Sequence, residues 1–156
     1  MTAATNTDIE ADIEADVVTG GCLCGAVRYR LQPPLRSVVA CHCGQCRRTS
    51  GNYVSATAVP IDKFALSNDA GLKWYRSSEQ ARRGFCAECG SSLFWSADGR
   101  DTITIMSGTI DGKTGLTTVA HICVADKGDY YELNSSEPQY DGLDHPTPQY
   151  IPPIDG

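Results

Sequence analysis

Three cysteines lie within six consecutive residues of this chain, at Cys41, Cys43 and Cys46. Thiols in a Cys-x-Cys step bridge each other only under strain, because a disulfide needs particular Cα and Cβ separations. A zinc ion has no such requirement, since it takes thiolates at about 2.3 Å in a tetrahedral arrangement, and three protein ligands with one open position are typical of catalytic zinc. The spacing therefore predicts a zinc site whose fourth position is open to a small molecule.

Two further cysteine pairs, Cys22/Cys24 and Cys86/Cys89, together supply the four ligands that a structural zinc ion takes. The second pair has the two-residue gap of a zinc knuckle and is followed by Gly90, which tolerates the positive φ of a tight turn. An ion shared by the two pairs would close a loop of about sixty residues. The sequence thus predicts two zinc ions, one structural and one catalytic.

The cysteine spacing leaves the fourth ligand of the catalytic ion open. Cys123, His42 or His121 could complete the site, which would make both zinc ions structural. Cys123 lies between two apolar residues, where an unpaired cysteine is more often a small core residue. His42 stands between two ligands and points away from them if the loop is extended. His121 shares a strand face with Cys123, and a structural role is expected for it.

Arginines adjoin both cysteine groups. Arg47 and Arg48 follow the three clustered cysteines, and Arg82 and Arg83 precede the knuckle. Guanidinium groups bind carboxylates through paired hydrogen bonds, so these side chains, Arg47 and Arg48 above all, are candidate contacts for a glutathione-like thiol. Solvated surface charge is the alternative interpretation.

Short β-strands are expected to position the cysteines. Apolar and polar residues alternate over 27–31, and β-branched residues are frequent over 53–59, as is typical of strands. One helical turn is expected at 47–51 and a turn at 60–64. The other expected strands are at 37–40, 72–76, 81–85, 92–95, 102–106 and 117–124. The predicted fold class is mainly β, with short antiparallel strands in packed sheets joined by zinc.

The length of 156 residues suits a single domain. Residues 19–136 are expected to form a zinc-binding domain, between a flexible acidic tail at 1–18 and an extended Pro-rich tail at 137–156. The formal net charge is −6, and the 1–18 segment holds five acidic residues and no Lys or Arg. The rest of the chain is therefore nearly neutral.

This charge disfavours nucleic acid as a partner, because nucleic-acid binding needs a basic face. The chain has neither a long apolar run nor a basic, apolar leader, so we expect no membrane partner and a cytoplasmic location. There, the eight cysteines are more plausible as metal ligands than as disulfides. A homodimer is one assembly that the sequence allows.

Several of these motifs together resemble the glutathione-dependent formaldehyde-activating enzymes, whose wider group includes the centromere protein V family. The resemblance covers nearly the whole expected domain. The matching pieces are residues 21–25, 41–47, 83–91, 107–111 and 121–122.

The resemblance implies a β-tent type fold related to methionine sulfoxide reductase B. It also implies a structural zinc on the two cysteine pairs and a catalytic zinc on the three clustered cysteines. In the namesake enzyme of the family, glutathione captures formaldehyde as S-hydroxymethylglutathione. Carbon–sulfur bond formation or cleavage on a glutathione-type adduct is therefore the implied activity, with glutathione as co-substrate.

The same chemistry is consistent with the residues alone, because zinc with an open position lowers the pKa of a bound thiol or polarises a carbonyl oxygen. The leading hypothesis is a zinc-dependent carbon–sulfur lyase acting on a small-molecule thiol or thiol adduct. A noncatalytic, zinc-stabilised binding module is the alternative. A methionine sulfoxide reductase with Cys123 as nucleophile is a third reading, weakened by the lack of an evident resolving thiol.

Overall fold

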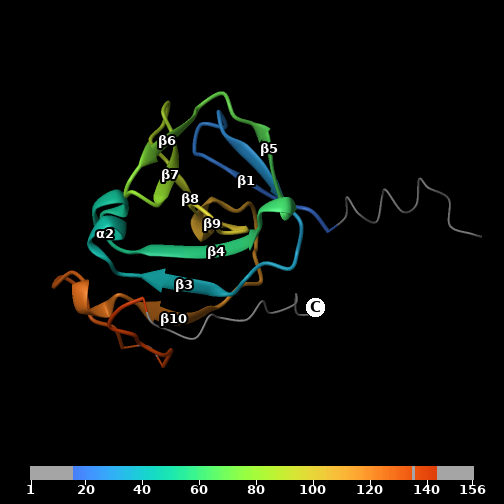
Figure 1. Ribbon diagram of the computed structural model, residues 1–156. Coiled ribbons are helices and arrows are strands. Elements are labelled where there is room, and N and C mark those ends of the chain that lie inside the picture. Colours follow the sequence, from blue (N-terminus) through green and yellow to red (C-terminus); the bar gives the residue numbers. More distant parts are fainter. Residues whose placement is uncertain (1–15, 135, 144–156) are drawn as a thin grey trace, which may run out of the picture.

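The computed structural model describes residues 16–134 and 136–143 (Figure 1). Strands predominate in this part of the chain, with one short α-helix and three single 3-10 turns. The strands are β1 (Val18–Gly21), β2 (Arg28–Leu31), β3 (Val38–Cys41), β4 (Val54–Pro60), β5 (Phe64–Asn68), β6 (Leu72–Arg76), β7 (Ala81–Cys86), β8 (Ser92–Ala97), β9 (Thr102–Met106) and β10 (Thr118–Ile122). The helix is α2 (Gly44–Ser50), and the 3-10 turns are η1 (Ile61–Lys63), η2 (Ser107–Thr109) and η3 (Val124–Asp126).

The strands form two sheets. One has three strands in the order β1-β2-β5, and the other has seven in the order β10-β3-β4-β9-β8-β7-β6. In Figure 1, β10, β3 and β4 lie side by side along the base of the molecule, and α2 stands at their left end. The mainly β prediction is therefore confirmed.

The hydrophobic core lies between the two sheets. Tyr29 of β2 and Phe94 of β8 are almost fully buried, and their rings meet edge to face with centroids 5.3 Å apart. Phe64 of β5 also meets Phe94 edge to face, at 5.1 Å. Burying one such aromatic side chain stabilises the fold by about 1.5–3 kcal/mol. This contact holds the small sheet against the strands that carry the knuckle.

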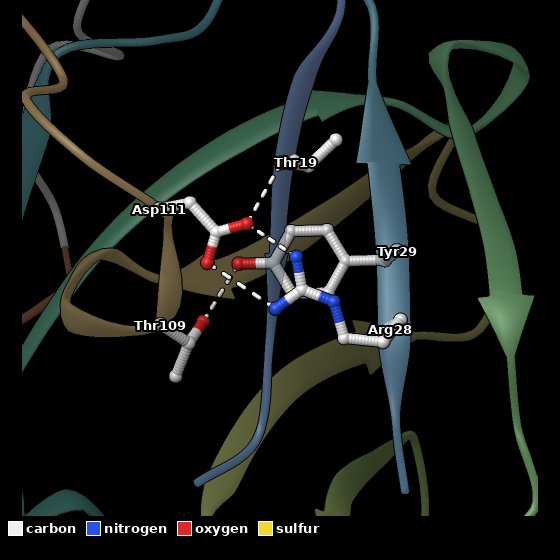
Figure 2. Close-up of polar contacts among 5 residues, drawn as sticks. All are labelled: Thr19, Arg28, Tyr29, Thr109 and Asp111. Carbon is white, nitrogen blue, oxygen red and sulfur yellow. Dashed lines mark hydrogen bonds and ion pairs between the residues drawn. The ribbon is translucent and has the colours of Figure 1, made fainter. Parts of the chain in front are cut away.

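Polar contacts join the small sheet to the loop after β9 (Figure 2). The carboxylate of Asp111 accepts from both terminal nitrogens of Arg28 and from the hydroxyl of Thr19. Beneath this ion pair, the buried hydroxyl of Tyr29 lies 2.7 Å from Thr109 Oγ1. The loop is thereby fixed to β1 and β2.

The sequence analysis predicted neither β1 nor β5 as a strand, and it placed the start of the helix too late. β1 is rich in glycine because Gly20 packs on the Tyr29 ring, where a Cβ would lie 2.3 Å from Cζ. β5 has no residue that is fully buried, so it lacks the alternating pattern that marks a half-buried strand. The helix begins at Gly44 rather than at residue 47.

One strand pair also departs from the antiparallel expectation. β10 pairs with β3 in parallel, with Ile122 opposite Cys41. Because parallel strands need a long crossover, a residue far along the chain is brought beside the cysteine loop. This pairing places the end of β10 at the candidate site.

The predicted tails lie largely outside the described residues, so their boundaries stay predictions. Residues 137–143 are described, and this segment runs beside β10, where the backbone N–H of His121 donates to the Pro138 carbonyl and that of Tyr140 to the His121 carbonyl. Within the described residues, no helix has the length and apolarity needed to span a bilayer.

Candidate metal centres and active site

The three-cysteine site consists of Cys41, Cys43 and Cys46. Cys41 ends β3, Cys43 is the N-cap residue of α2, and Cys46 is buried in the first turn of that helix. The backbone N–H of Cys46 donates to the Cys43 sulfur at 3.3 Å, which fixes the loop. Gly51, with φ of 81°, ends the helix in the left-handed conformation that glycine adopts without strain.

The four-cysteine site brings together two pairs of cysteines. Cys22 and Cys24 follow β1, whereas Cys86 is the last residue of β7 and Cys89 lies in the turn after it. The Cys24 sulfur lies 3.6 Å from that of Cys22 and 3.7 Å from that of Cys86. Four sulfurs held tetrahedrally at about 2.3 Å from one ion lie about 3.8 Å apart, so these separations fit zinc. The predicted grouping of the two distant pairs is thus the grouping that the folded chain makes.

Side chains and amides surround the sulfurs of this four-cysteine site. The Val27 amide donates to the Cys22 sulfur at 3.2 Å. Ser91 Oγ lies 3.2 Å from the Cys89 sulfur and accepts from the Leu23 amide. The Ser91 hydroxyl lowers the pKa of the Cys89 thiol to about 5, which favours the thiolate that zinc needs. The sequence analysis included Ser91 only as the last residue of the 83–91 motif and gave it no role, although its position directly after Gly90 was a usable signal.

The sulfurs of the three-cysteine site all lie within 4.8 Å of one another, which also suits a shared ion. Hydrogen bonds from the Cys41 thiol and then from Cys46 lower the pKa of Cys43 to about 2. The same contacts raise the pKa of Cys41, chiefly through Cys43, and that of Cys46, chiefly through Cys41. A soft dication that replaces the shared protons would satisfy all three sulfurs at once.

Both histidines near this site use their ring nitrogens elsewhere. His42 is completely buried, with Nε2 2.9 Å from His121 Nδ1 and Nδ1 hydrogen-bonded to the hydroxyl of Tyr131. His121 Nε2 in turn lies 3.9 Å from a carboxylate oxygen of Glu137. Burial, with the charges of His121 and Lys127, lowers the pKa of His42 to about 4, so its ring is neutral at pH 7. Neither imidazole therefore belongs to the group of three sulfurs.

Cys123 lies beside the three-cysteine site without joining its close group. It is buried just beyond β10 with φ of 56°, a left-handed conformation that is uncommon for cysteine. Its thiol contacts that of Cys41, and burial raises its pKa. Such a thiol is a weaker nucleophile at neutral pH than a free cysteine, which disfavours the reductase reading.

The arginines of the sequence analysis occupy different positions around the site. Arg83 of β7 donates to Gln45 Oε1 at 3.1 Å and approaches the Cys46 sulfur at 3.8 Å. Arg47 is half-buried and Arg48 is exposed, both on α2. Of these arginines, Arg83 is therefore the one that the structure shows at the thiols. Its partner Gln45 lies inside the cysteine motif, and a polar side chain at that position could have indicated such a contact from the sequence.

Comparison with known proteins identifies relatives over most of the chain. Residues 17–126 match the family described as glutathione-dependent formaldehyde-activating enzyme. An uncharacterized lyase of Schizosaccharomyces pombe is 29% identical over 115 residues, covering 73% of this chain and 83% of that protein. A candidate glutathione-dependent formaldehyde-activating enzyme of Halomonas elongata is 26% identical over 132 residues, covering 78% of this chain and 83% of its own.

The fold also has a counterpart among solved structures. A crystal structure of a Rhodobacter sphaeroides protein superposes with a TM-score of 0.51 at 20% identity. The match covers 62% of this chain and 90% of the other. At this identity the likeness concerns the fold alone.

Proposed function

Because this chain belongs to the family of glutathione-dependent formaldehyde-activating enzymes, we propose that it is a zinc-dependent carbon–sulfur lyase. Its substrate would be a glutathione-type adduct of a small aldehyde or another electrophile. The names of two relatives, a lyase and a candidate formaldehyde-activating enzyme, support this reaction class. The catalytic domain would span residues 19–136.

One observation carries the proposal. The sulfurs of Cys41, Cys43 and Cys46 lie within 4.8 Å of one another, and the described residues bring no further His, Cys, Asp or Glu ligand atom into that close group. Three protein ligands with an open fourth position are the arrangement of a catalytic zinc, whereas the four-cysteine site is complete. The two sites therefore suit different roles.

The reaction balances without an external oxidant or reductant. In the forming direction, the thiol sulfur bonds to the aldehyde carbon, and the thiol proton moves to the carbonyl oxygen. In the cleaving direction, the C–S bond breaks, the hydroxyl proton returns to sulfur, and the aldehyde is released. Zinc, when bound, supplies the Lewis acidity that lowers the pKa of a thiol or polarises the carbonyl oxygen.

The chain itself supplies the frame for this chemistry. The amide of Cys46 and the guanidinium of Arg83 both approach sulfurs of the three-cysteine site, which holds those sulfurs in place and offsets their negative charge. Glutathione is the proposed co-substrate, and Arg47 and Arg48 remain candidate contacts for its carboxylates. The neutral His42 lies within the cysteine loop, and its hydrogen bonds to Tyr131 and His121 hold that loop in its orientation.

A noncatalytic, zinc-stabilised module is the second candidate, and the contact between Cys123 and Cys41 is the observation in its favour. If the Cys123 sulfur closes the fourth position, no small molecule reaches the ion. Zinc content and exchange separate the two functions, because an enzyme predicts one inert and one exchangeable ion, whereas a module predicts two inert ones.

The direct test is a substrate screen. Zinc-loaded protein is incubated with glutathione and a panel of aldehydes, including ¹³C-formaldehyde, and NMR follows the formation and decay of each adduct. We expect the wild type to accelerate at least one of these exchanges, and we expect Cys43→Ser to abolish that acceleration. Cys123→Ser is the matched cysteine control and should retain it. Equal rates with wild type, Cys43→Ser and buffer would reject the lyase.

A further inference from the structure

An open pocket of about 320 Å³ adjoins the three-cysteine site between α2 and the strands β6, β7 and β8. Arg83 and Met106 connect the two places, since both line the pocket and both also contact the thiol region. Arg83 approaches the Cys46 sulfur at 3.8 Å, and Met106 packs in the same buried cluster as Cys46. The volume is at the small end of the range for ligand sites, about 300–1,000 Å³. A molecule that extends from the thiols would enter this pocket.

The pocket is positively charged. Among the residues that the structure describes, Lys73 and Arg83 are the charged side chains that line it, and no Asp or Glu does. Other cations of these strands have partners, because Arg76 binds Asp98 at 2.6 Å and Arg82 stacks over the Trp74 ring at 4.2 Å. An anionic group is therefore the ligand that this lining favours.

Arg83 also has a hydrogen-bond donor that no described residue uses. Its Nη2 contacts Gln45 Oε1 and the Cys46 sulfur, while its Nε is buried without a hydrogen-bond partner among the described residues. A buried donor without a partner is costly, and a planar guanidinium binds a carboxylate through two parallel hydrogen bonds. A carboxylate at this point would use that donor capacity.

The walls of the pocket suit a short carbon chain beside the charge. Tyr75 and Phe85 line it, and in the register of β6 and β7 they stand opposite Arg83 and Lys73, so each ring lies on the same sheet face as a cation. These rings offer apolar surface beside the two charges.

We propose that this pocket binds the acidic arm of the substrate, with the guanidinium of Arg83 as the carboxylate contact and Lys73 as a second positive charge. The substrate class would then be thiols and thiol adducts that carry a carboxylate a few bonds from sulfur, rather than simple alkyl thiols. Binding of the carboxylate needs no reaction at sulfur, whereas the identity of the ligand as a thiol rests on the proposed function.

The test uses full-length, zinc-loaded protein and S-methylglutathione, which keeps both carboxylates of glutathione and has no ionisable thiol. NMR follows the backbone amides of Gly84 and Phe85, which both line the pocket, during titration. We expect saturable shifts at both positions and an affinity about tenfold or more weaker in Arg83→Gln, since charge-assisted hydrogen bonds are lost. Arg76→Gln removes the same charge from β6 outside the pocket and should bind as the wild type does.

Lys73→Gln is a second variant for the case that Arg83→Gln folds poorly, because Lys73 is exposed and its replacement leaves the core intact. We expect it to bind about threefold more weakly. Absence of shifts at Gly84 and Phe85, or unchanged affinity in both pocket variants, would overturn the inference. Saturable shifts with S-methylglutathione in a protein that accelerates no thiol–aldehyde exchange would instead reject the lyase and leave the carboxylate site in place.

Discussion

Cys86→Ser is the substitution whose effect on stability follows most directly from the fold. Cys86 is fully buried at the end of β7, and its sulfur lies 3.7 Å from that of Cys24. Serine is a poor zinc ligand at neutral pH, so the variant should lose the ion of the four-cysteine site. The bridge between the segment after β1 and the knuckle would then open.

The size of the effect can be worked out from chain length. The link between Cys22 and Cys86 closes a loop of about 64 residues, and the loop-closure relation for a cross-link of that length gives about 4 kcal/mol at 25 °C. A domain of this size loses about 2–4 °C in Tm for each kcal/mol. We therefore expect Tm to fall by about 10–15 °C.

The assay is a thermal melt followed by circular dichroism, with the zinc content of each sample measured in parallel. Cys43→Ser is the matched control, since its site lies within one short loop that β3 and α2 already hold. It should shift Tm by no more than about 3 °C. A Cys86→Ser protein with the wild-type Tm and full zinc content would refute the assignment of a structural ion to these four cysteines.

Three further predictions concern individual contacts. Cys43→Ser should bind about one zinc ion fewer per chain than the wild type, as measured by atomic absorption; equal zinc content would contradict the three-cysteine site. Tyr29→Phe should lower the free energy of unfolding by about 1–2 kcal/mol in urea titrations, because the buried hydroxyl loses Thr109; an unchanged midpoint would show that this contact contributes nothing. The Arg28 guanidinium, together with the Thr19 hydroxyl, lowers the pKa of the Asp111 carboxyl, so the ion pair stabilises the fold above about pH 4 and its contribution disappears as pH falls further. The advantage of the wild type over Asp111→Asn should accordingly be about 0.5–1 kcal/mol at pH 7 for this half-exposed pair and vanish near pH 2, and a pH-independent difference would exclude the pair as its source.

The cysteine grouping was predictable because metal binding depends on residue type and short spacing. Cys-x-Cys and Cys-x-x-Cys steps place sulfurs close together in almost any tight loop, so each local cluster could be predicted without knowledge of the fold, and its role as a set of metal ligands stays a prediction. The strands of the large sheet were also predictable, since all of them except β6 bury apolar residues.

Other features depend on tertiary contacts that leave no local pattern. β5 is held by backbone hydrogen bonds to β2 and carries mostly exposed side chains, so periodicity does not mark it. The left-handed backbone of Cys123 arises where β10 ends beside β3, and the bond from Tyr131 to His42 joins residues 89 positions apart. Arg83 reaches Cys46 only because β7 and α2 lie side by side in the fold.

The central claim is that the three-cysteine site holds a metal ion with a position open to a substrate thiol. Replacing zinc with cobalt(II) tests it most directly, because thiolate-to-cobalt charge transfer absorbs in the near ultraviolet. We predict that glutathione intensifies this absorption in the wild type, that S-methylglutathione does not, and that Cys43→Ser shows no response. A wild-type spectrum that stays unchanged at glutathione concentrations that saturate the pocket would contradict the claim and favour a fourth protein ligand such as Cys123.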